Sequence, residues 1–203
     1  MILFVNNGRF KNRGKQSYSE KIIQVLTSRN IPFYSVDRIE PLPKGIRQKI
    51  RGILLGGSNL ELSDPNTDYK WYEHNLHYMQ MFPDVPVYGI CFGCQLLALY
   101  YGGKIVHGEY YKESNETQID LSSPLFSNGF ERNSVCKYYF SDQIVPFSSK
   151  SGVKEIAWVS KKEQRIPVGF EFAKDRWGTI FHPEFYKKTG VIFENFARFC
   201  GSI

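Results

Sequence analysis

Long hydrophobic runs are missing from this sequence. No stretch approaches the roughly eighteen consecutive apolar residues that a membrane-spanning helix needs. The N-terminal MILFVNNG also lacks the basic region and the small-residue cleavage site of a secretory signal. The sequence therefore predicts a cytoplasmic protein without membrane association. Of its 203 residues, 42% are hydrophobic and 16% aromatic, so the chain can bury a substantial core, and we expect a single domain over residues 1–203.

Cysteine is also scarce. The four cysteines are too few and too scattered for a disulfide framework, and the large apolar segments make such cross-links unnecessary, so reduced thiols are expected. No group of potential ligands has the spacing of a metal site, and no cofactor is expected. The four cysteines are Cys91, Cys94, Cys136 and Cys200.

Basic residues are in excess, but they are dispersed. The formal charge of +6 and the pI of about 9.0 would suit a polyanionic partner. The densest basic patch, GRFKNRGK at 8–15, is nevertheless short, and no nucleic-acid-binding motif accompanies it. We therefore expect a solvated basic face and no nucleic-acid partner.

The N-terminal half alternates strand patterns with helix patterns. Such alternation predicts a parallel sheet with helices on both faces. The expected strands are the short apolar runs at 2–6, 31–36, 49–57 and 86–90. The expected helices are the periodic segments at 17–30, with Ser17 and Ser19 as candidate caps, and at 68–82, and the segment that follows Cys91.

From about residue 104 the pattern changes to short β-branched or aromatic runs, which predict successive strands, some of them antiparallel. The fold class is therefore α/β, with three layers: a central, mostly parallel sheet flanked by helices, plus additional antiparallel strands. A C-terminal helix is expected at 187–200. The expected later strands are at 104–111, 116–121, 134–140, 153–160, 166–172 and 178–181.

Cys91 lies where the fourth predicted strand meets a helix. The pattern GICFG at 89–93 has the form of a nucleophile elbow, in which flanking glycines admit a close approach of strand and helix. A thiol at a helix N-terminus lies near unpaired N–H groups and the positive end of the helix dipole, which favours the thiolate. The N–H of Phe92 is then placed to receive an oxyanion.

His182 is the best candidate for the base that such a nucleophile needs. It follows an apolar strand in TIFHPEF, and Glu184 lies two residues further on. Residues i and i+2 of an extended segment project to the same side, and Pro183 stiffens this segment, so Glu184 is expected to hold the imidazole. His74 and His77 lie on a predicted helix, and His107 has no acidic neighbour beyond Glu109. Cys91, His182 and Glu184 therefore form a candidate catalytic triad.

Together these motifs resemble the class I glutamine amidotransferase family, whose hallmarks are G-x-C-x-G-x-Q and F-H-P-E. The matching segments are GICFGCQLLALYYGG at 89–103 and IFHPE at 180–184, while LLGGS at 54–58 corresponds to the family's glycine-rich oxyanion loop. The similarity extends over essentially the whole chain, and it is greatest to the stand-alone glutaminase subunits of GMP synthetases.

The resemblance implies that Cys91 forms a γ-glutamyl thioester with L-glutamine and that ammonia and glutamate are released. It also implies that the N–H groups of Gly57 and Phe92 hold the oxyanion and that Gln95 contacts the substrate. Because free ammonia in water is protonated and diffuses away, the implied partner is a separate ATP-dependent synthetase of the ATP-pyrophosphatase type. The acceptor reaction implied is the formation of GMP from XMP.

Two residues depart from the family pattern. Ser58 stands where the family commonly has proline, a change expected to loosen the oxyanion loop. KYYFSDQIV at 137–145 resembles the segment that contacts the α-groups of glutamine, and in it Phe140 replaces a histidine typical of GMP synthetases. In the family that histidine is linked with communication to the synthetase, so the change bears on the acceptor assignment.

Other functions are compatible with parts of the sequence. CFGC is a C-x-x-C pattern, in which Cys94 would be the resolving thiol of a thiol-disulfide oxidoreductase. His182 and Glu184 would then have no role. A γ-glutamyl peptide hydrolase and a catalytically degenerate member of the same fold are further alternatives.

Overall fold

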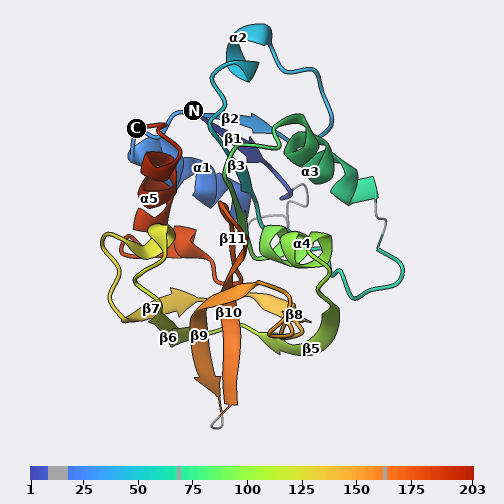
Figure 1. Ribbon diagram of the computed structural model, residues 1–203, viewed down its shortest axis with the longest axis vertical. Coiled ribbons are helices and arrows are strands. Elements are labelled where there is room, and N and C mark those ends of the chain that lie inside the picture. The colour runs from blue at the N-terminus through green and yellow to red at the C-terminus, as the bar shows by residue number, and fades with distance from the viewer. Residues whose placement is uncertain (9–17, 68–69, 162–163) are drawn as a thin grey trace.

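The parallel part of the fold follows the predicted alternation. The computed structural model describes residues 1–8, 18–67, 70–161 and 164–203 (Figure 1). The basic patch at 8–15, apart from Gly8, and the candidate cap Ser17 lie outside these residues. Every residue of the first, third and fourth strands is buried, as expected for strands covered on both faces. The first four strands are β1 (Ile2–Val5), β2 (Phe33–Val36), β3 (Gly52–Leu55) and β4 (Val87–Ile90).

Helices cover both faces of the parallel strands, as predicted. Figure 1 shows α1 and α5 on one side of these strands and α3 and α4 on the other. A short exposed helix, α2, was not predicted from the sequence, because it is a single turn without an apolar stripe. The helices are α1 (Tyr18–Ser28), α2 (Lys44–Arg47), α3 (Lys70–Met81), α4 (Phe92–Tyr100) and α5 (Val191–Phe199).

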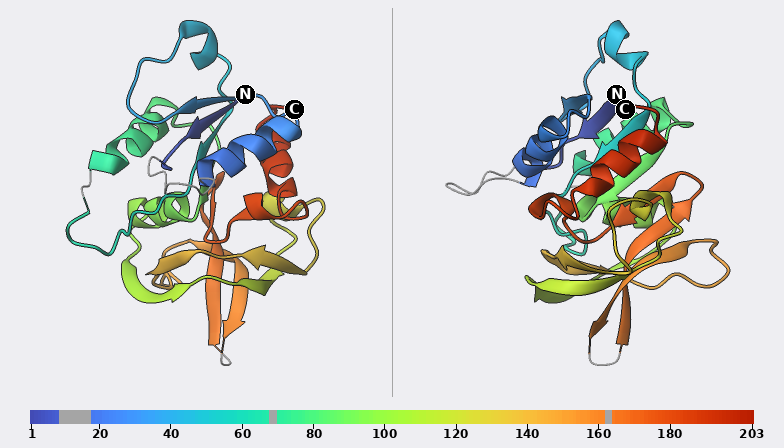
Figure 2. Two further views of the ribbon diagram at one scale, coloured as in Figure 1. Left: turned by 180° about the vertical axis from the view of Figure 1, so that it is seen from behind. Right: turned by 90° about the vertical axis from the view of Figure 1, so that its left-hand side faces the viewer.

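A nine-stranded sheet joins the two halves of the chain. Its strand order is β2-β1-β3-β4-β11-β10-β9-β6-β7, and β1 to β4 with β11 pair in parallel. The remaining pairs are antiparallel, and the β9–β10 hairpin extends away from the parallel part (Figure 2). These strands are β6 (Ser114–Ile119), β7 (Asn133–Lys137), β9 (Lys154–Lys161), β10 (Gln164–Ala173) and β11 (Arg176–Thr179).

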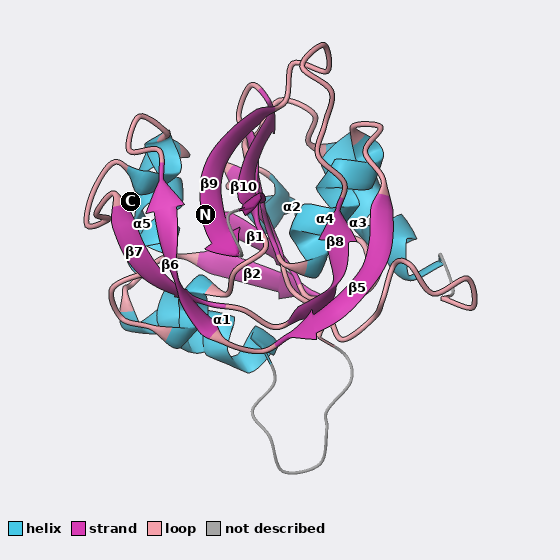
Figure 3. Ribbon diagram, turned by 90° about the horizontal axis from the view of Figure 1, so that it is seen from below, coloured by secondary structure: helices cyan, strands magenta, loops and turns pink. Residues whose placement is uncertain are grey.

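Two strands form a separate antiparallel pair. They are β5 (Ile105–Tyr111) and β8 (Phe140–Ile144), which lie beside α4 in Figure 3. The prediction of one strand over 134–140 was therefore wrong, because β7 ends at Lys137 and β8 begins at Phe140 in the other sheet. No helix in the described part of the chain is long and apolar enough to cross a membrane.

Glycine permits α4 to pack directly on the sheet. A Cβ atom at Gly93 would lie 2.4 Å from the carbonyl oxygen of Leu55 in β3, and one at Gly89 would lie 2.5 Å from the carbonyl carbon of Gly93. Both contacts are with backbone, which cannot move aside as a flexible side chain can. The expected close approach at 89–93 is therefore confirmed, and it fixes where α4 begins.

We expect Gly93→Ala to lower the free energy of unfolding by about 1–3 kcal/mol, because the added methyl group forces the helix away from β3. Urea unfolding measures the change. Gly45→Ala is the matched control, since nothing lies within 4 Å of a Cβ atom at this exposed position in α2. Equal stability of Gly93→Ala and Gly45→Ala would contradict the packing argument.

Candidate active site

Cys91 connects β4 to α4 in a strained backbone conformation. Its φ of 50° and ψ of −105° lie where non-glycine residues are rare. Two hydrogen bonds hold it there: its N–H donates to Thr179 O at 2.7 Å, and its carbonyl oxygen accepts the N–H of Gln95 at 2.9 Å. The nucleophile elbow expected from GICFG is thus present, with β11 supplying one of its supports.

The Cys91 side chain lines a small cavity of about 90 Å³. Only 4% of the residue is exposed, and its Sγ lies 3.5 Å from the carbonyl oxygen of Tyr139. The thiol is therefore largely shielded but remains open to a small molecule in the cavity. The lining residues are Tyr18, Ser58, Asn59, Leu60, Glu61, Cys91, Gln95, Tyr139, Phe140, Ser141 and Asp142.

His182 and Glu184 form the predicted pair. Nδ1 of His182 lies 2.7 Å from Oε1 of Glu184, and both side chains are buried. The reason given from the sequence was wrong, however, because Pro183–Phe185 form a 3₁₀ turn and are not extended. His182 itself is extended, and its N–H donates to Lys137 O at 2.8 Å. The turn places the Glu184 carboxylate within hydrogen-bond distance of Nδ1 of His182.

Gly57 shows that the imidazole and the thiol lie close together. The point where a Cβ atom of Gly57 would stand is 3.3 Å from Cε1 of His182 and 3.8 Å from Cβ of Cys91. Nε2 of His182 is buried and has no hydrogen-bond partner among the described residues. The second ring nitrogen is therefore available to exchange a proton with a group at Cys91.

Burial and charge have opposite effects on His182. Burial lowers the pKa of the imidazole, but the charges of Glu184 and Cys91 outweigh it and raise the pKa from 6.5 to about 10. The pair with Glu184 thus favours an imidazolium at neutral pH. A histidine that already carries the second proton can deliver it to a leaving group, and once neutral it can accept a proton from water.

Aromatic rings enclose the imidazole. Tyr18, the first residue of α1, lies over it with 4.6 Å between ring centroids, and Tyr139 and Phe185 meet it edge-on at 5.6 and 5.8 Å. These rings restrict the orientation of His182 and exclude water from it. Sequence reasoning missed all three, because Tyr18 and Tyr139 are far from His182 in sequence and a phenylalanine three residues after His182 does not by itself indicate a ring contact.

Gln95 reaches into the cavity from α4. Its Nε2 donates to the carbonyl oxygen of Asp142 at 2.9 Å, and only 3% of the residue is exposed. This bond links α4 to β8. Gln95 therefore forms part of the cavity wall, together with residues of the loop that follows β3.

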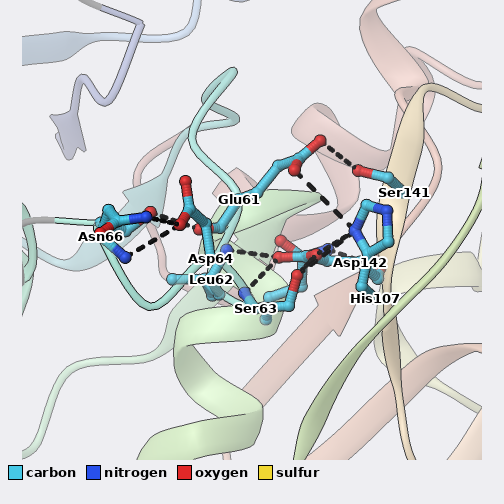
Figure 4. A network of polar contacts seen from close by, with 10 residues as sticks. Glu61, Leu62, Ser63, Asp64, Asn66, His107, Ser141 and Asp142 are labelled. Atoms are coloured by element: carbon cyan, nitrogen blue, oxygen red, sulfur yellow. Dashed lines mark hydrogen bonds and ion pairs between the residues drawn. The ribbon is translucent and has the colours of Figure 1, made fainter.

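Asp142, in β8, is hydrogen-bonded to the loop that follows β3. Its carboxylate accepts hydrogen bonds from the N–H groups of Leu62 and Ser63 and from Ser63 Oγ (Figure 4). His107 lies nearby, with Nδ1 3.8 Å from Asp142 and 3.9 Å from Glu61. The expectation that His107 has no acidic neighbour beyond Glu109 was thus wrong, because both carboxylates come from distant segments.

The two residues that depart from the family pattern, Ser58 and Phe140, both line the cavity. Ser58 Oγ accepts the N–H of Leu60 at 3.2 Å, which provides a tie within the loop where proline would stiffen it. Phe140 packs against Tyr111 with 5.3 Å between ring centroids and lines the cavity. The Phe92 side chain is buried against Leu62 and Leu96, so only its backbone is near the site.

Cys94 does not line the cavity. It is fully buried on the sheet side of α4, where its Sγ lies 2.6 Å from the point that a Cβ atom of Gly178 would occupy. Burial raises the pKa of the Cys94 thiol well above its ordinary value. All four cysteines are free. In the described part of the chain no group of three or more His, Cys, Asp or Glu side chains could hold a metal ion.

An α/β sheet with a cysteine elbow and a paired histidine and glutamate is the arrangement of an amidotransferase. The family model for class I glutamine amidotransferases matches residues 13–199, and the chain belongs to this family. The predicted resemblance and fold class are therefore confirmed.

Among its relatives is a glutamine-hydrolyzing GMP synthase subunit from Methanothermobacter thermautotrophicus, 27% identical over 100% of this chain and 99% of that protein. The glutamine-hydrolyzing GMP synthase of Clostridium perfringens is 34% identical over 76% of this chain, which matches only 27% of the length of that protein. Among solved structures, a glutamine amidotransferase from Thermotoga maritima matches with a TM-score of 0.68 and 15% identity, covering 97% of this chain and 80% of the other.

The raised pKa of His182 predicts how stability depends on pH. The stabilisation from the His182–Glu184 pair is complete below about pH 6.5 and is lost as the pH rises through about 10. Glu184→Gln should therefore lower the free energy of unfolding by about 3 kcal/mol near pH 6. The difference from the wild type should shrink toward pH 10, as measured by urea unfolding at each pH.

Glu131→Gln is the control for this measurement, because it removes an exposed carboxylate that pairs with Lys188. Its profile should run parallel to that of the wild type. A stability difference for Glu184→Gln that stays constant over this pH range would show that the pair does not titrate as described.

Proposed function

We propose that this chain hydrolyses L-glutamine to glutamate and ammonia and delivers the ammonia to a separate ATP-dependent synthetase. The observation that carries the proposal is that His182 pairs with the Glu184 carboxylate through Nδ1 while its ring lies close to Cys91, which lines the cavity. Membership of the class I glutamine amidotransferase family supports the same reaction. In this proposal residues 1–203 act as one amidotransferase domain, which the continuous nine-stranded sheet supports.

The first half of the reaction forms a thioester. The sulfur of Cys91 attacks the side-chain amide carbon of glutamine, and its proton resides on Nε2 of His182. The amide oxygen becomes an oxyanion, which the backbone N–H groups of Phe92 and Gly57 would stabilise. When the carbon–nitrogen bond breaks, His182 gives its proton to the departing nitrogen, so that ammonia leaves and the γ-glutamyl group remains on Cys91.

The second half releases glutamate. A water molecule replaces ammonia, His182 accepts one of its protons, and the hydroxyl oxygen attacks the thioester carbon. The carbon–sulfur bond breaks, and the proton returns to sulfur. Glu184 keeps Nδ1 protonated throughout, so Nε2 is the nitrogen that exchanges protons in both halves.

The names of the relatives support a synthetase partner. The relative from M. thermautotrophicus is named as one subunit of a GMP synthase, whereas the clostridial relative is a longer protein of which this chain matches about a quarter. We propose that the present chain supplies ammonia to an ATP-pyrophosphatase-type protein that converts XMP to GMP. Phe140, at the cavity wall, is the residue in which this chain departs from the GMP synthetase pattern.

A thiol-disulfide oxidoreductase is disfavoured by the position of Cys94. A resolving thiol has to reach the attacking sulfur and ionise, but Cys94 is fully buried and its pKa is raised. A γ-glutamyl peptide hydrolase uses the same triad, and only its substrate differs.

Cys91→Ala should abolish glutaminase activity, because no other described thiol lines the cavity. A glutamine-mimicking diazo-ketone should label the wild-type protein at Cys91, as read by peptide mass spectrometry. Cys136→Ala removes a buried cysteine in β7 and should leave labelling unchanged. Labelling confined to another cysteine would remove the proposed nucleophile.

Affinity capture from the native source, read by mass spectrometry, should recover an ATP-pyrophosphatase-type protein. Adding this protein with ATP and XMP should raise glutaminase activity and produce GMP. Because a stand-alone amidotransferase often has low activity without its synthetase, the reconstituted pair is the decisive sample. Recovery of γ-glutamyl peptides as turned-over substrates, with no synthetase, would favour the hydrolase.

A further inference from the structure

The cavity at Cys91 is acidic. Among the described residues that line it, Glu61 and Asp142 carry carboxylates, and none is lysine, arginine or histidine. A cavity lined in this way favours a ligand with a positive charge. The two carboxylates are not equivalent, however, because their surroundings differ.

Asp142 already has its partners. The residue is 2% exposed, and its carboxylate oxygens accept hydrogen bonds from two backbone N–H groups and from Ser63 Oγ. A ligand could reach it only by displacing the loop that follows β3. Asp142 therefore has a structural role, which is to hold that loop against β8.

Glu61 is the accessible carboxylate. Its side chain is 47% exposed, one oxygen accepts a hydrogen bond from Ser141 Oγ at 2.7 Å, and the other lies 3.9 Å from Nδ1 of His107 (Figure 4). A carboxylate can accept more hydrogen bonds than these two contacts provide. Its oxygens thus remain able to bind a donor that enters the cavity.

The backbone at Glu61 is held in place. Thr67 Oγ1 donates to the Glu61 carbonyl oxygen at 2.6 Å, and the next two residues donate their N–H groups to Asp142. The carboxylate therefore projects from a fixed part of the loop. A fixed charge loses less conformational entropy on binding than one on a mobile segment.

We propose that Glu61 binds the α-ammonium group of the substrate and thereby selects compounds with a free α-amino group. The inference rests on the proposed function. When the amide carbon of glutamine is at Cys91, its α-carbon end extends along the cavity. That end carries an ammonium and a carboxylate, and only the ammonium can pair with Glu61. An ammonium donates charge-assisted hydrogen bonds to a carboxylate, and an analogue without it would leave Glu61 without this partner.

The test compares two reagents on the full chain. One is the glutamine-mimicking diazo-ketone, and the other is the same compound without its α-amino group. The wild type should be modified at Cys91 at least tenfold faster by the aminated reagent. Glu61→Gln should slow that reaction roughly tenfold to a hundredfold, while the reaction with the other reagent stays unchanged. Glu61→Asp, which keeps the charge, should retain part of the preference.

Glu116→Gln is the matched control, because Glu116 is an exposed carboxylate on β6 away from the cavity, and it should keep the wild-type preference. Equal slowing of both reagents by Glu61→Gln would assign Glu61 to loop support and overturn the inference. A wild type that does not distinguish the reagents would also overturn it while leaving the glutaminase proposal intact. If neither reagent modified Cys91, the proposed function would fail as well.

Discussion

The close packing of α4 on β3 and β4 is the constraint on which the site depends. Because Gly89 and Gly93 have no side chains, the helix begins immediately at the end of β4, and the chain must turn within one residue. That residue is Cys91, whose positive φ is the cost of the turn. The position of the sulfur is therefore set by backbone contacts between a helix and a sheet, which are among the least deformable parts of the molecule.

The segment from β7 to β8 supports the residues that lie around Cys91. Lys137 supports His182 through its carbonyl oxygen, and Asp142, five residues further on, supports the loop after β3. Gln95 completes the link by donating to the backbone of Asp142. The segment from β7 to β8 thus holds both His182 and the loop in position relative to Cys91. A change in this segment would alter several parts of the cavity together.

Local patterns were sufficient to predict much of the fold and the three central residues. Strands such as Val87–Ile90, the turn at Cys91 and the pairing of His182 with Glu184 depend on neighbours close in sequence. Contacts made by tertiary packing could not be predicted in this way. Asp142 approaches Ser63 from 79 residues away, and the ring of Tyr18 covers an imidazole that lies in a different element. The 3₁₀ turn at Pro183 was missed because proline suits the first position of such a turn as well as extended chain.

The position of β11 determines when the surroundings of Cys91 can form as the chain is synthesised. This strand is late in sequence, yet it lies between β4 and β10 and supplies the carbonyl oxygen that fixes the backbone of Cys91. The imidazole follows directly after it. A chain that extends only as far as α4 therefore has Cys91 without the support of Thr179 and without His182 beside it. In the proposed function, the glutamine site is thus complete only once the last strand has entered the sheet.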